Sequence, residues 1–227
     1  NDAIGNFLYL SGYNFGSEYT FGTSLQKTLW TKGMPNPNLS WEKITIYNLG
    51  LDWGLWNNKI YGEFDVFSRD REGIAGYRSA SLPNTFGTTP PLENLNSITT
   101  QGFEIMLGTA HNWNQLRFNF NANLSYSRSK WDYYDEPEYA DPDMSRLKKN
   151  TGNWVDRTIG YQADGLFASQ EEIDALEYDQ DGNGNSTLRP GDIRIIDLNN
   201  DKKIDWRDMT VIGDGAIPHW MFGINTD

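Results

Sequence analysis

Residues 116–127, LRFNFNANLSYS, decide the fold of this chain because they alternate strictly between apolar and polar side chains. In a β-strand, successive side chains point to opposite faces of the sheet, so this period of two separates the two kinds of residue. The apolar set is Leu116, Phe118, Phe120, Ala122, Leu124 and Tyr126, and the polar set is Arg117, Asn119, Asn121, Asn123, Ser125 and Ser127. The stretch therefore predicts a strand in a sheet with one apolar face and one polar face.

The same alternation recurs on both sides of this stretch. Residues 44–53 and 60–69 predict a hairpin with a tight turn at residues 57–58, because asparagine tolerates the left-handed conformation. Residues 102–108 predict the partner of the quoted strand, and a further strand begins at Trp220. We therefore expect an all-β fold built from antiparallel, up-and-down strands.

The lengths of strands and loops favour a transmembrane barrel. Strands of about ten residues can cross the apolar part of a bilayer when they are tilted. The connections are short at 54–59 and 110–115 and long at 70–97 and 128–217, which is the asymmetry of transmembrane β-barrels. Tryptophans are expected to form two girdles at the lipid–water boundaries. They are Trp53, Trp56 and Trp113 near the short turns, and Trp41, Trp131 and Trp220 near the long loops.

The composition excludes other classes of protein. The 227 residues include 31 Asp and Glu against 19 Lys and Arg, which gives a formal net charge of −12. No basic footprint for a nucleic acid is present. The chain has no cysteine and therefore no disulfide framework, and no apolar run is long enough for a transmembrane helix.

An acidic stretch at residues 197–208, DLNNDKKIDWRD, has the spacing of an EF-hand-type calcium loop. Such loops take oxygen ligands from positions 1, 3, 5, 7, 9 and 12, and the ligand at position 7 is a backbone carbonyl. Lys202 stands at position 6, where glycine eases the turn, and aspartate replaces glutamate at position 12, as in dockerin-type loops. We therefore expect weak calcium binding. The predicted ligands are Asp197, Asn199, Asp201, Lys203, Asp205 and Asp208.

A second candidate calcium site lies just upstream. Its oxygen-bearing residues also alternate along the chain, but Pro190 falls where the twelfth-position ligand is needed. A small insertion would let an aspartate beyond the proline close the site. The candidate ligands are Asp179, Asp181, Asn183, Asn185 and Asp192. Solvated, glycine-rich turns are the alternative interpretation of both acidic stretches.

Two other functions are compatible with the residues. A secreted, calcium-stabilised carbohydrate-binding β-sandwich would bury Phe118, Phe120 and Leu124 against a second sheet of this chain, whereas a barrel would turn them to lipid. An acidic-site glycosidase could draw paired carboxylates from Glu136, Glu138, Asp141 and Asp143. A solvated acidic loop explains these four residues more simply, so we expect no enzymatic activity.

Several ordered motifs resemble the SusC/RagA-type TonB-dependent outer-membrane importers. They are NPNLSWEKITIYNLGLDWGLWNNKIYGEFDVFSRD, SLPNTFGTTPPLENLNSITTQGFEIMLGT, FNFNANLSYSRSK and GDIRIIDLNNDKKIDWRDMTVIGDGAIPHWMFGIN, and together they run from about Pro35 to the end. The resemblance implies a plugged barrel of about 22 strands in the outer membrane of a Gram-negative, Bacteroidetes-type bacterium. It also implies energy from the TonB complex, a SusD-like surface lipoprotein as partner, and import of glycans, oligosaccharides or peptides. Because the sequence contains no plug and no TonB-contacting segment, we expect a piece of the C-terminal half of such an importer.

The expected organisation has four parts. Residues 1–43 form an outer loop with short strands at 7–10 and 19–21, and 44–127 form two barrel hairpins with an outer loop at 70–97. Residues 128–217 form a long extracellular excursion with the calcium-type loop, and 218–227 start the next barrel strand. The excursion contains one predicted short helix at 170–178, which a capping box of Ser169 and Glu172 begins.

Overall fold

The structure is a computed structural model that describes residues 8–78, 80, 87–114 and 116–226. The chain divides into two compact units. The first unit comprises residues 1–137, 150–153 and 219–227, and the second comprises residues 138–149 and 154–218.

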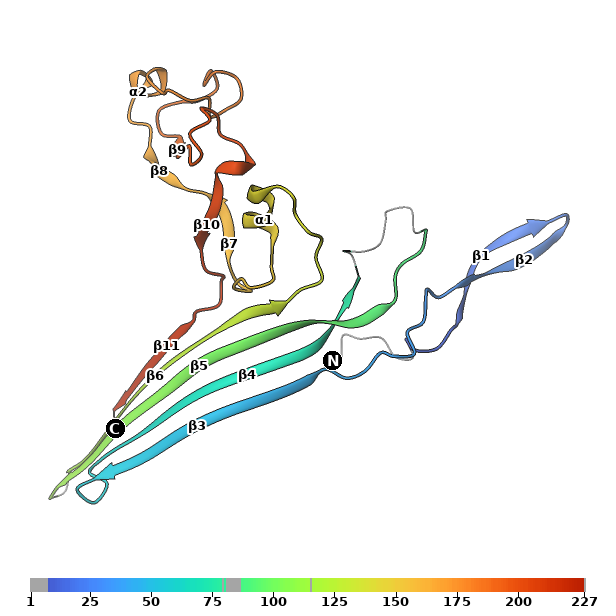
Figure 1. Cartoon of the computed structure of the whole chain (residues 1–227). Coiled ribbons are helices and arrows are strands. Elements are labelled where there is room, and N and C mark those ends of the chain that lie inside the picture. The colour runs from blue at the N-terminus through green and yellow to red at the C-terminus, as the bar shows by residue number, and fades with distance from the viewer. Residues whose placement is uncertain (1–7, 79, 81–86, 115, 227) are drawn as a thin grey trace. The chain divides into compact units, whose positions relative to one another are not determined.

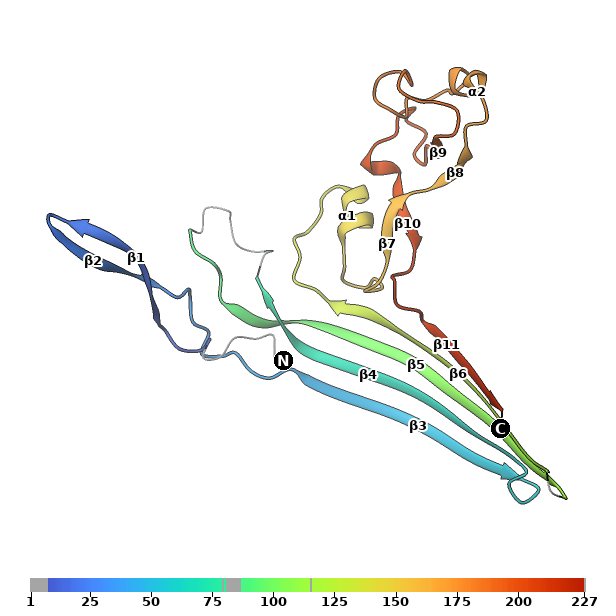
Figure 2. The same cartoon turned by 180° about the vertical axis from the view of Figure 1, so that it is seen from behind.

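A five-stranded antiparallel sheet dominates the first unit, with the strand order β11-β6-β5-β4-β3 (Figure 1). Its strands are β3 (Lys43–Leu55), β4 (Ile60–Tyr77), β5 (Leu92–Trp113), β6 (Leu116–Tyr133) and β11 (Trp220–Thr226). The view from behind shows the same strands side by side (Figure 2). Neighbours in the sheet are also successive strands of this unit, so the predicted up-and-down antiparallel arrangement is confirmed.

The strands extend further than the sequence predicted. The expected loop at 70–97 is wrong at both ends, because β4 continues to Tyr77 and β5 begins at Leu92. The strand β6 likewise continues to Tyr133. The pairing of β4 with β5 shifts register after Arg71, and such a bulge interrupts the strict alternation on which the prediction depended.

The predicted tight turn between β3 and β4 is confirmed. Trp56, Asn57 and Asn58 all adopt the left-handed conformation, with φ of 51°, 58° and 60°. At the second short connection β5 reaches Trp113, so most of the predicted turn at 110–115 belongs to strand, and residue 115 itself lies outside the described residues.

Aromatic rings cover strand glycines across the sheet. Trp53 is paired with Gly62, and a Cβ atom added to this glycine would lie 2.5 Å from Trp53 Cζ2. On the opposite face Phe67 is paired with Gly102, whose added Cβ would lie 2.6 Å from Phe67 Cζ. Each glycine therefore provides the space that a neighbouring ring fills.

A separate two-stranded ribbon precedes the sheet. It consists of β1 (Tyr13–Phe21) and β2 (Ser24–Thr31), which pair antiparallel around Gly22. The expected strand at 19–21 is part of β1. The expected strand at 7–10 is wrong for residues 8–10, which form a turn and a bend, and residue 7 lies outside the described residues.

The second unit is a small mixed fold within the connection between β6 and β11. Its elements are α1 (Pro142–Lys148), β7 (Thr158–Tyr161), β8 (Ala163–Leu166), α2 (Gln170–Asp174), β9 (Ile193–Ile195), the 3₁₀-helix η1 (Trp206–Asp208) and β10 (Met209–Gly213). β7 pairs with β10, and β8 pairs with β9. Phe167 and Ile173 are each only 1% exposed and form the centre of this unit.

The predicted helix in this unit exists, but it is shorter and is capped differently. It ends at Asp174, and Ser169 makes no side-chain capping hydrogen bond. Glu172 Oε2 accepts the N–H of Ala168 at 2.8 Å, so the predicted capping box is wrong. In a capping box Glu172 would accept the N–H of Ser169, but here it accepts that of the preceding residue.

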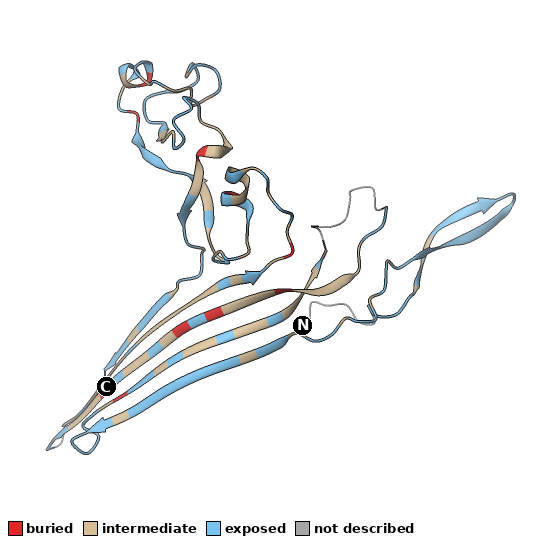
Figure 3. Ribbon diagram, viewed as in Figure 1, coloured by how far each residue is buried: buried red, intermediate tan, exposed pale blue. Residues whose placement is uncertain are grey.

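Among the residues that the structure describes, no apolar side chain of the sheet in the first unit is buried; Figure 3 colours the residues by burial. Within the described residues the buried apolar side chains are Leu147, Phe167 and Ile173, all of the second unit. Phe118 is exposed, and neither Phe120 nor Leu124 is buried. The β-sandwich alternative required all three to be buried, and that prediction is wrong. Among the described residues, no helix is both long and apolar enough to span a membrane.

Candidate functional site

The apolar side chains of the sheet align in rows that cross all five strands. In the central row Leu51 is paired with Phe64, and Ile105, Leu124 and Phe222 continue it. Parallel rows lie on either side, such as Leu49, Val66, Phe103, Tyr126 and Trp220. Many of these side chains are open to the surroundings, with Leu51 61% and Phe222 80% exposed. Together these rows form one continuous surface of the sheet, which we call the apolar face.

A polar row ends the apolar face towards the long loops. Thr45, Asp70, Thr99 and Lys130 stand in register there. Thr99 Oγ1 lies 2.9 Å from Asp70 Oδ1 and 2.7 Å from Asp132 Oδ2, so the polar groups are paired with one another. A mixed row of Tyr47, Ser68, Gln101 and Arg128 lies between this polar row and the apolar rows.

Two of the tryptophans expected in girdles lie on different faces of the sheet. Trp220 lies on the apolar face, with its ring 5.8 Å from that of Phe103 and 4.7 Å from that of Tyr126. Trp131 instead pairs with Ile98 on the opposite face, where it contacts the ring of Tyr134. The girdle assignment of Trp131 is therefore wrong, because its odd position in β6 places it with the polar residues.

The opposite face, called the polar face, carries carboxylates in facing pairs. Asp52 is directly opposite Glu63, and Asp65 is directly opposite Glu104. Like charges in direct cross-strand register destabilise a sheet unless water or counter-ions screen them. An open hollow of about 540 Å³ lies here, with Glu63, Asp65 and Glu104 in its lining. The polar face is therefore suited to water and not to a packed interior.

In the loop at 197–208, one carboxylate oxygen has no partner. Asp197 Oδ2 accepts the N–H of Lys202 at 2.9 Å. Asp197 Oδ1 is buried and makes no hydrogen bond. An orphaned, buried carboxylate oxygen is costly, and a bound cation would satisfy it.

The backbone of this loop has the turn that a calcium loop needs. Lys202, at the position usually held by glycine, adopts a φ of +67°. The last predicted ligand, Asp208, is fully buried, and its two oxygens accept the N–H groups of Leu198 at 3.0 Å and of Asp205 at 2.8 Å. These bonds tie the end of the loop back to its beginning.

The remaining predicted ligands are held by local contacts. Asn199 Oδ1 accepts the N–H of Asp201 at 2.9 Å, and Asp201 Oδ1 accepts that of Lys203 at 3.2 Å. The N–H of Arg207 at 2.8 Å, followed by Lys203, lowers the pKa of Asp205. In the described chain, no three carboxylates of this loop gather within 4.8 Å of one another. A calcium ion at this loop would require Asp201 and Asp205 to turn towards it.

In the upstream candidate, the loop's own donors occupy the oxygens. Asp181 accepts the N–H groups of Asn183, Asn185 and Thr187 and the hydroxyl of Thr187, at 2.6–2.8 Å. These bonds, with the Thr187 hydroxyl first, hold the pKa of Asp181 well below its usual range. Asp179, Asn185 and Asp192 accept the N–H groups of Gly182, Gln180 and Arg189. The backbone of Asp179 also pairs with that of Lys202 and Ile204, which joins the two acidic stretches.

The carboxylates considered for glycoside hydrolysis have structural contacts. Glu136 accepts the N–H groups of Asn150 at 2.7 Å and Thr151 at 2.8 Å. Asp141 caps α1, and Asp143 pairs with Arg146 at 3.2 Å. Of these candidates, Glu136 and Asp141 thus accept backbone N–H groups, and Asp143 forms an ion pair.

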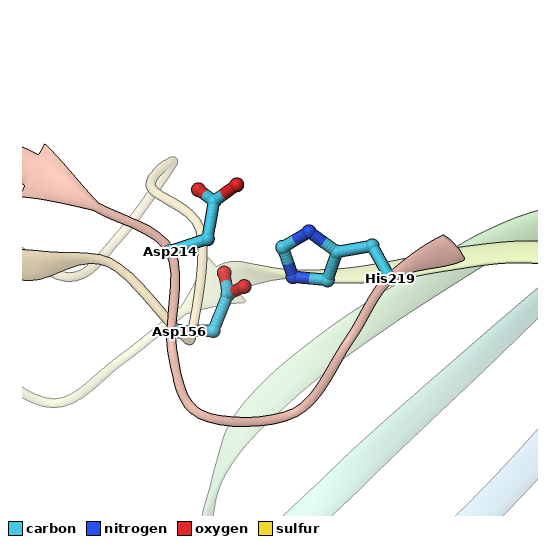
Figure 4. Close-up of side chains that lie close together, drawn as sticks. All are labelled: Asp156, Asp214 and His219. Carbon is cyan, nitrogen blue, oxygen red and sulfur yellow. The ribbon is translucent and has the colours of Figure 1, made fainter. Parts of the chain in front are cut away.

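A pair of carboxylates that no sequence motif indicated lies at the end of the β7–β10 ribbon. Asp156 precedes β7 and Asp214 follows β10, and the pairing of Thr158 with Gly213 brings these chain ends together (Figure 4). His219, also drawn there, belongs to the first unit. Two carboxylates fall short of the six to eight oxygens that calcium takes. The proximity of Asp156 and Asp214 follows from the pairing of β7 with β10, and that pairing is known only from the structure.

Residues 6–211 match the family model "TonB dependent receptor-like, beta-barrel". The chain belongs to this family. The resemblance to SusC/RagA-type receptors that the sequence motifs indicated is thereby confirmed.

Individual relatives agree with this assignment. The chain is 27% identical over 210 residues to the TonB-dependent receptor SusC of Bacteroides thetaiotaomicron, covering 82% of this chain and 20% of SusC. It is 28% identical over 212 residues to the TonB-dependent receptor P26 of Formosa agariphila, covering 88% of this chain and 20% of P26. The chain thus spans about a fifth of the length of the curated relatives it matches.

The fold matches solved structures of the RagAB peptide importer. In the open-open state the TM-score is 0.66 at 20% identity, covering 100% of this chain and 23% of that chain. In the closed-closed state the TM-score is 0.61 at 18% identity, covering 100% of this chain and 24% of that chain.

Proposed function

We propose that this chain is part of a TonB-dependent importer that carries oligosaccharides or peptides across a bacterial outer membrane. The observation that carries the proposal is the two-faced sheet. Its apolar rows run unbroken across five strands, while the other face is lined by carboxylates, amides and hydroxyls. A barrel wall between lipid and a hydrated lumen needs this arrangement, because lipid-facing and lumen-facing residues alternate along each strand. Membership of the family supports this interpretation of the two faces.

The proposal includes partners that lie outside this chain. In the complete protein, an N-terminal part would contact the TonB complex, and a SusD-like surface lipoprotein would cover the outer opening. SusC and RagAB are the relatives that support this pairing. The chain itself is assigned a structural part in transport and no catalytic role.

The imported substrate is tested by deleting and restoring the gene. Cells that lack the importer are offered fluorescent oligosaccharides or fluorescent peptides, and uptake is measured before and after complementation. Restored uptake of one class identifies the substrate. Unchanged uptake of both classes in the deletion strain would contradict the import function.

We also propose that the loop at 197–208 binds calcium and stiffens the long outer connection of the importer. The ligands would be Asp197, Asn199, Asp201, Asp205 and Asp208 with the carbonyl of Lys203, and the orphaned Asp197 Oδ1 supports the fit. Calcium would cross-link a segment whose ordering otherwise costs conformational entropy. An affinity at the extracellular end, with a Kd of roughly 10⁻⁴–10⁻³ M, would suffice.

The loop at 197–208 is proposed as the principal calcium site. The upstream stretch is the weaker candidate because the Asp181 oxygens accept four hydrogen bonds from within that stretch, whereas Asp197 Oδ1 accepts none. Titrating calcium into the purified protein should slow proteolysis within 170–215, and Asp197→Asn should abolish the effect. Equal proteolysis with calcium and with chelator in the unsubstituted protein would contradict the proposal.

A further inference from the structure

The side chain at the seventh position of the loop carries a positive charge that the calcium-loop pattern does not use. An EF-hand loop takes only the backbone carbonyl from this position. Here Lys203 Nζ lies 3.3 Å from Asp205 Oδ2 and 4.0 Å from Asp201 Oδ2. Both partners are proposed calcium ligands, so the ammonium contacts two of the oxygen-bearing groups that an ion would need.

We infer that Lys203 is a built-in counter-cation that competes with calcium for this loop. In the metal-free protein its ammonium joins Asp201 and Asp205, and it leaves them when calcium binds. The inference rests on the proposed calcium function of the loop. It assigns Lys203 as the residue that sets the affinity of the site.

The position of the lysine permits this exchange. The side chain is 54% exposed, so its ammonium can return to water when it leaves the carboxylates. The N–H of Lys203 is also bonded to Asp201 Oδ1, which keeps the base of the side chain next to its partner. The lysine is therefore held close to the ligands, but it is not trapped there.

Charge makes the ammonium and the calcium ion compete for the same carboxylates. Calcium needs carboxylate oxygens at 2.3–2.6 Å, and each oxygen that turns towards the ion turns away from the ammonium. A single and a double positive charge about 6 Å apart in water repel by an amount equivalent to about a tenfold loss of affinity. Because the lysine is exposed, this penalty should fall as salt screens the charges.

Two neighbouring cations differ from Lys203 in their contacts. Arg207 Nη1 also lies 3.3 Å from Asp205 Oδ2, but its guanidinium stacks over the ring of Trp206 at 4.8 Å. Lys202 is adjacent and has the same charge, yet its ammonium forms no ion pair within the part of the chain that the structure describes. Lys202 is therefore the matched control for removing one positive charge from the loop.

The test compares Lys203→Met and Lys202→Met with the unsubstituted, intact importer in detergent at low salt. Terbium luminescence, sensitised by Trp206 within the loop, reports metal at this site, and competition with calcium gives the calcium affinity. We expect Lys203→Met to bind calcium about tenfold more tightly and Lys202→Met less than about threefold more tightly. In chelator, Lys203→Met should be cleaved faster within 170–215 than the unsubstituted protein, because the loop has lost its internal cation.

The outcomes separate the two proposals. If Asp197→Asn abolishes metal binding but Lys203→Met binds calcium no more tightly than the unsubstituted protein, the calcium site stands and the role of Lys203 is refuted. If Lys202→Met gains as much affinity as Lys203→Met, the effect is one of general charge and the inference also fails. If neither the unsubstituted protein nor Lys203→Met binds metal at the loop, both the calcium function and this inference are wrong.

Discussion

Substituting arginine for Leu51 would place a charge in the central row of the apolar face. Leu51 is 61% exposed on that face, so its replacement leaves no large cavity and mainly changes what meets the surroundings. If those surroundings are lipid, an arginine near the middle of the bilayer costs about 2–4 kcal/mol. We therefore expect Leu51→Arg to destabilise the folded protein in a membrane by about that amount.

The structure supplies two controls for this prediction. Thr45 lies on the same face six residues earlier, which is about 20 Å along the strand and about 15 Å along the bilayer normal at a tilt of about 40°. That distance is half of a hydrocarbon layer about 30 Å thick, so Thr45→Arg should cost only about 0–1 kcal/mol. Asp52→Arg, on the polar face opposite Glu63, should be neutral or stabilising because it replaces a like-charge pair with an ion pair.

The assay is urea unfolding of the intact protein refolded into lipid vesicles, with the folded fraction read from heat-dependent gel mobility. The three variants should rank Leu51→Arg, Thr45→Arg and Asp52→Arg from most to least destabilised. Equal stabilities of the Leu51 and Asp52 variants would refute the assignment of the two faces.

Three further predictions concern a close contact on the apolar face and the two acidic loops. Gly62→Ala should destabilise the sheet by about 1–3 kcal/mol, because the new methyl group meets the Trp53 ring; Gly213→Ala, with nothing within 4 Å, is the control in the same unfolding assay. Asp208→Ala should lower the free energy of unfolding by roughly 1–3 kcal/mol even without calcium, because the N–H groups of Leu198 and Asp205 lose their acceptor. A variant that is as stable as the unsubstituted protein in chelator would argue against these buried contacts. Because the pKa of Asp181 is lowered, its hydrogen bonds stabilise the upstream loop above the ordinary carboxyl pKa. Protection factors of the amides at 179–192 should therefore fall only below about pH 4, and Asp181→Asn should remove this pH dependence.

The strands were predictable where alternation was strict and unpredictable where it was interrupted. The hairpin at 44–69 and the strand at 116–127 followed from a period of two, and the asparagine turn followed from its tolerance of positive φ. The bulge after Arg71 breaks that period, so the extension of β4 could not be read from the sequence. The ribbon of β1 and β2 was only partly predicted, because its residues alternate weakly.

For the two faces and the loops, too, the sequence showed the pattern of residues but not the contacts that they make. Which residues share a face followed from odd and even positions, but the facing of Asp65 with Glu104 depends on the register between strands. The calcium-type spacing was visible in the sequence, whereas the orphaned oxygen of Asp197 and the ion pairs of Lys203 depend on how the loop folds. Ser169 and Glu172 matched a capping box, yet the glutamate bonded to Ala168 because hydrogen-bond partners are set by local geometry.

The most direct test uses the absence of cysteine from this sequence. Single cysteines at the neighbouring positions Leu49 and Asn48 are introduced into an otherwise cysteine-free importer and spin-labelled in lipid vesicles. Collision with oxygen, which concentrates in lipid, is then compared with collision with a water-soluble nickel chelate. The label at position 49 should collide more often with oxygen, and the label at position 48 should collide more often with the nickel chelate. Equal accessibility of both labels to the nickel chelate would contradict the claim that the two faces of this sheet meet lipid and water.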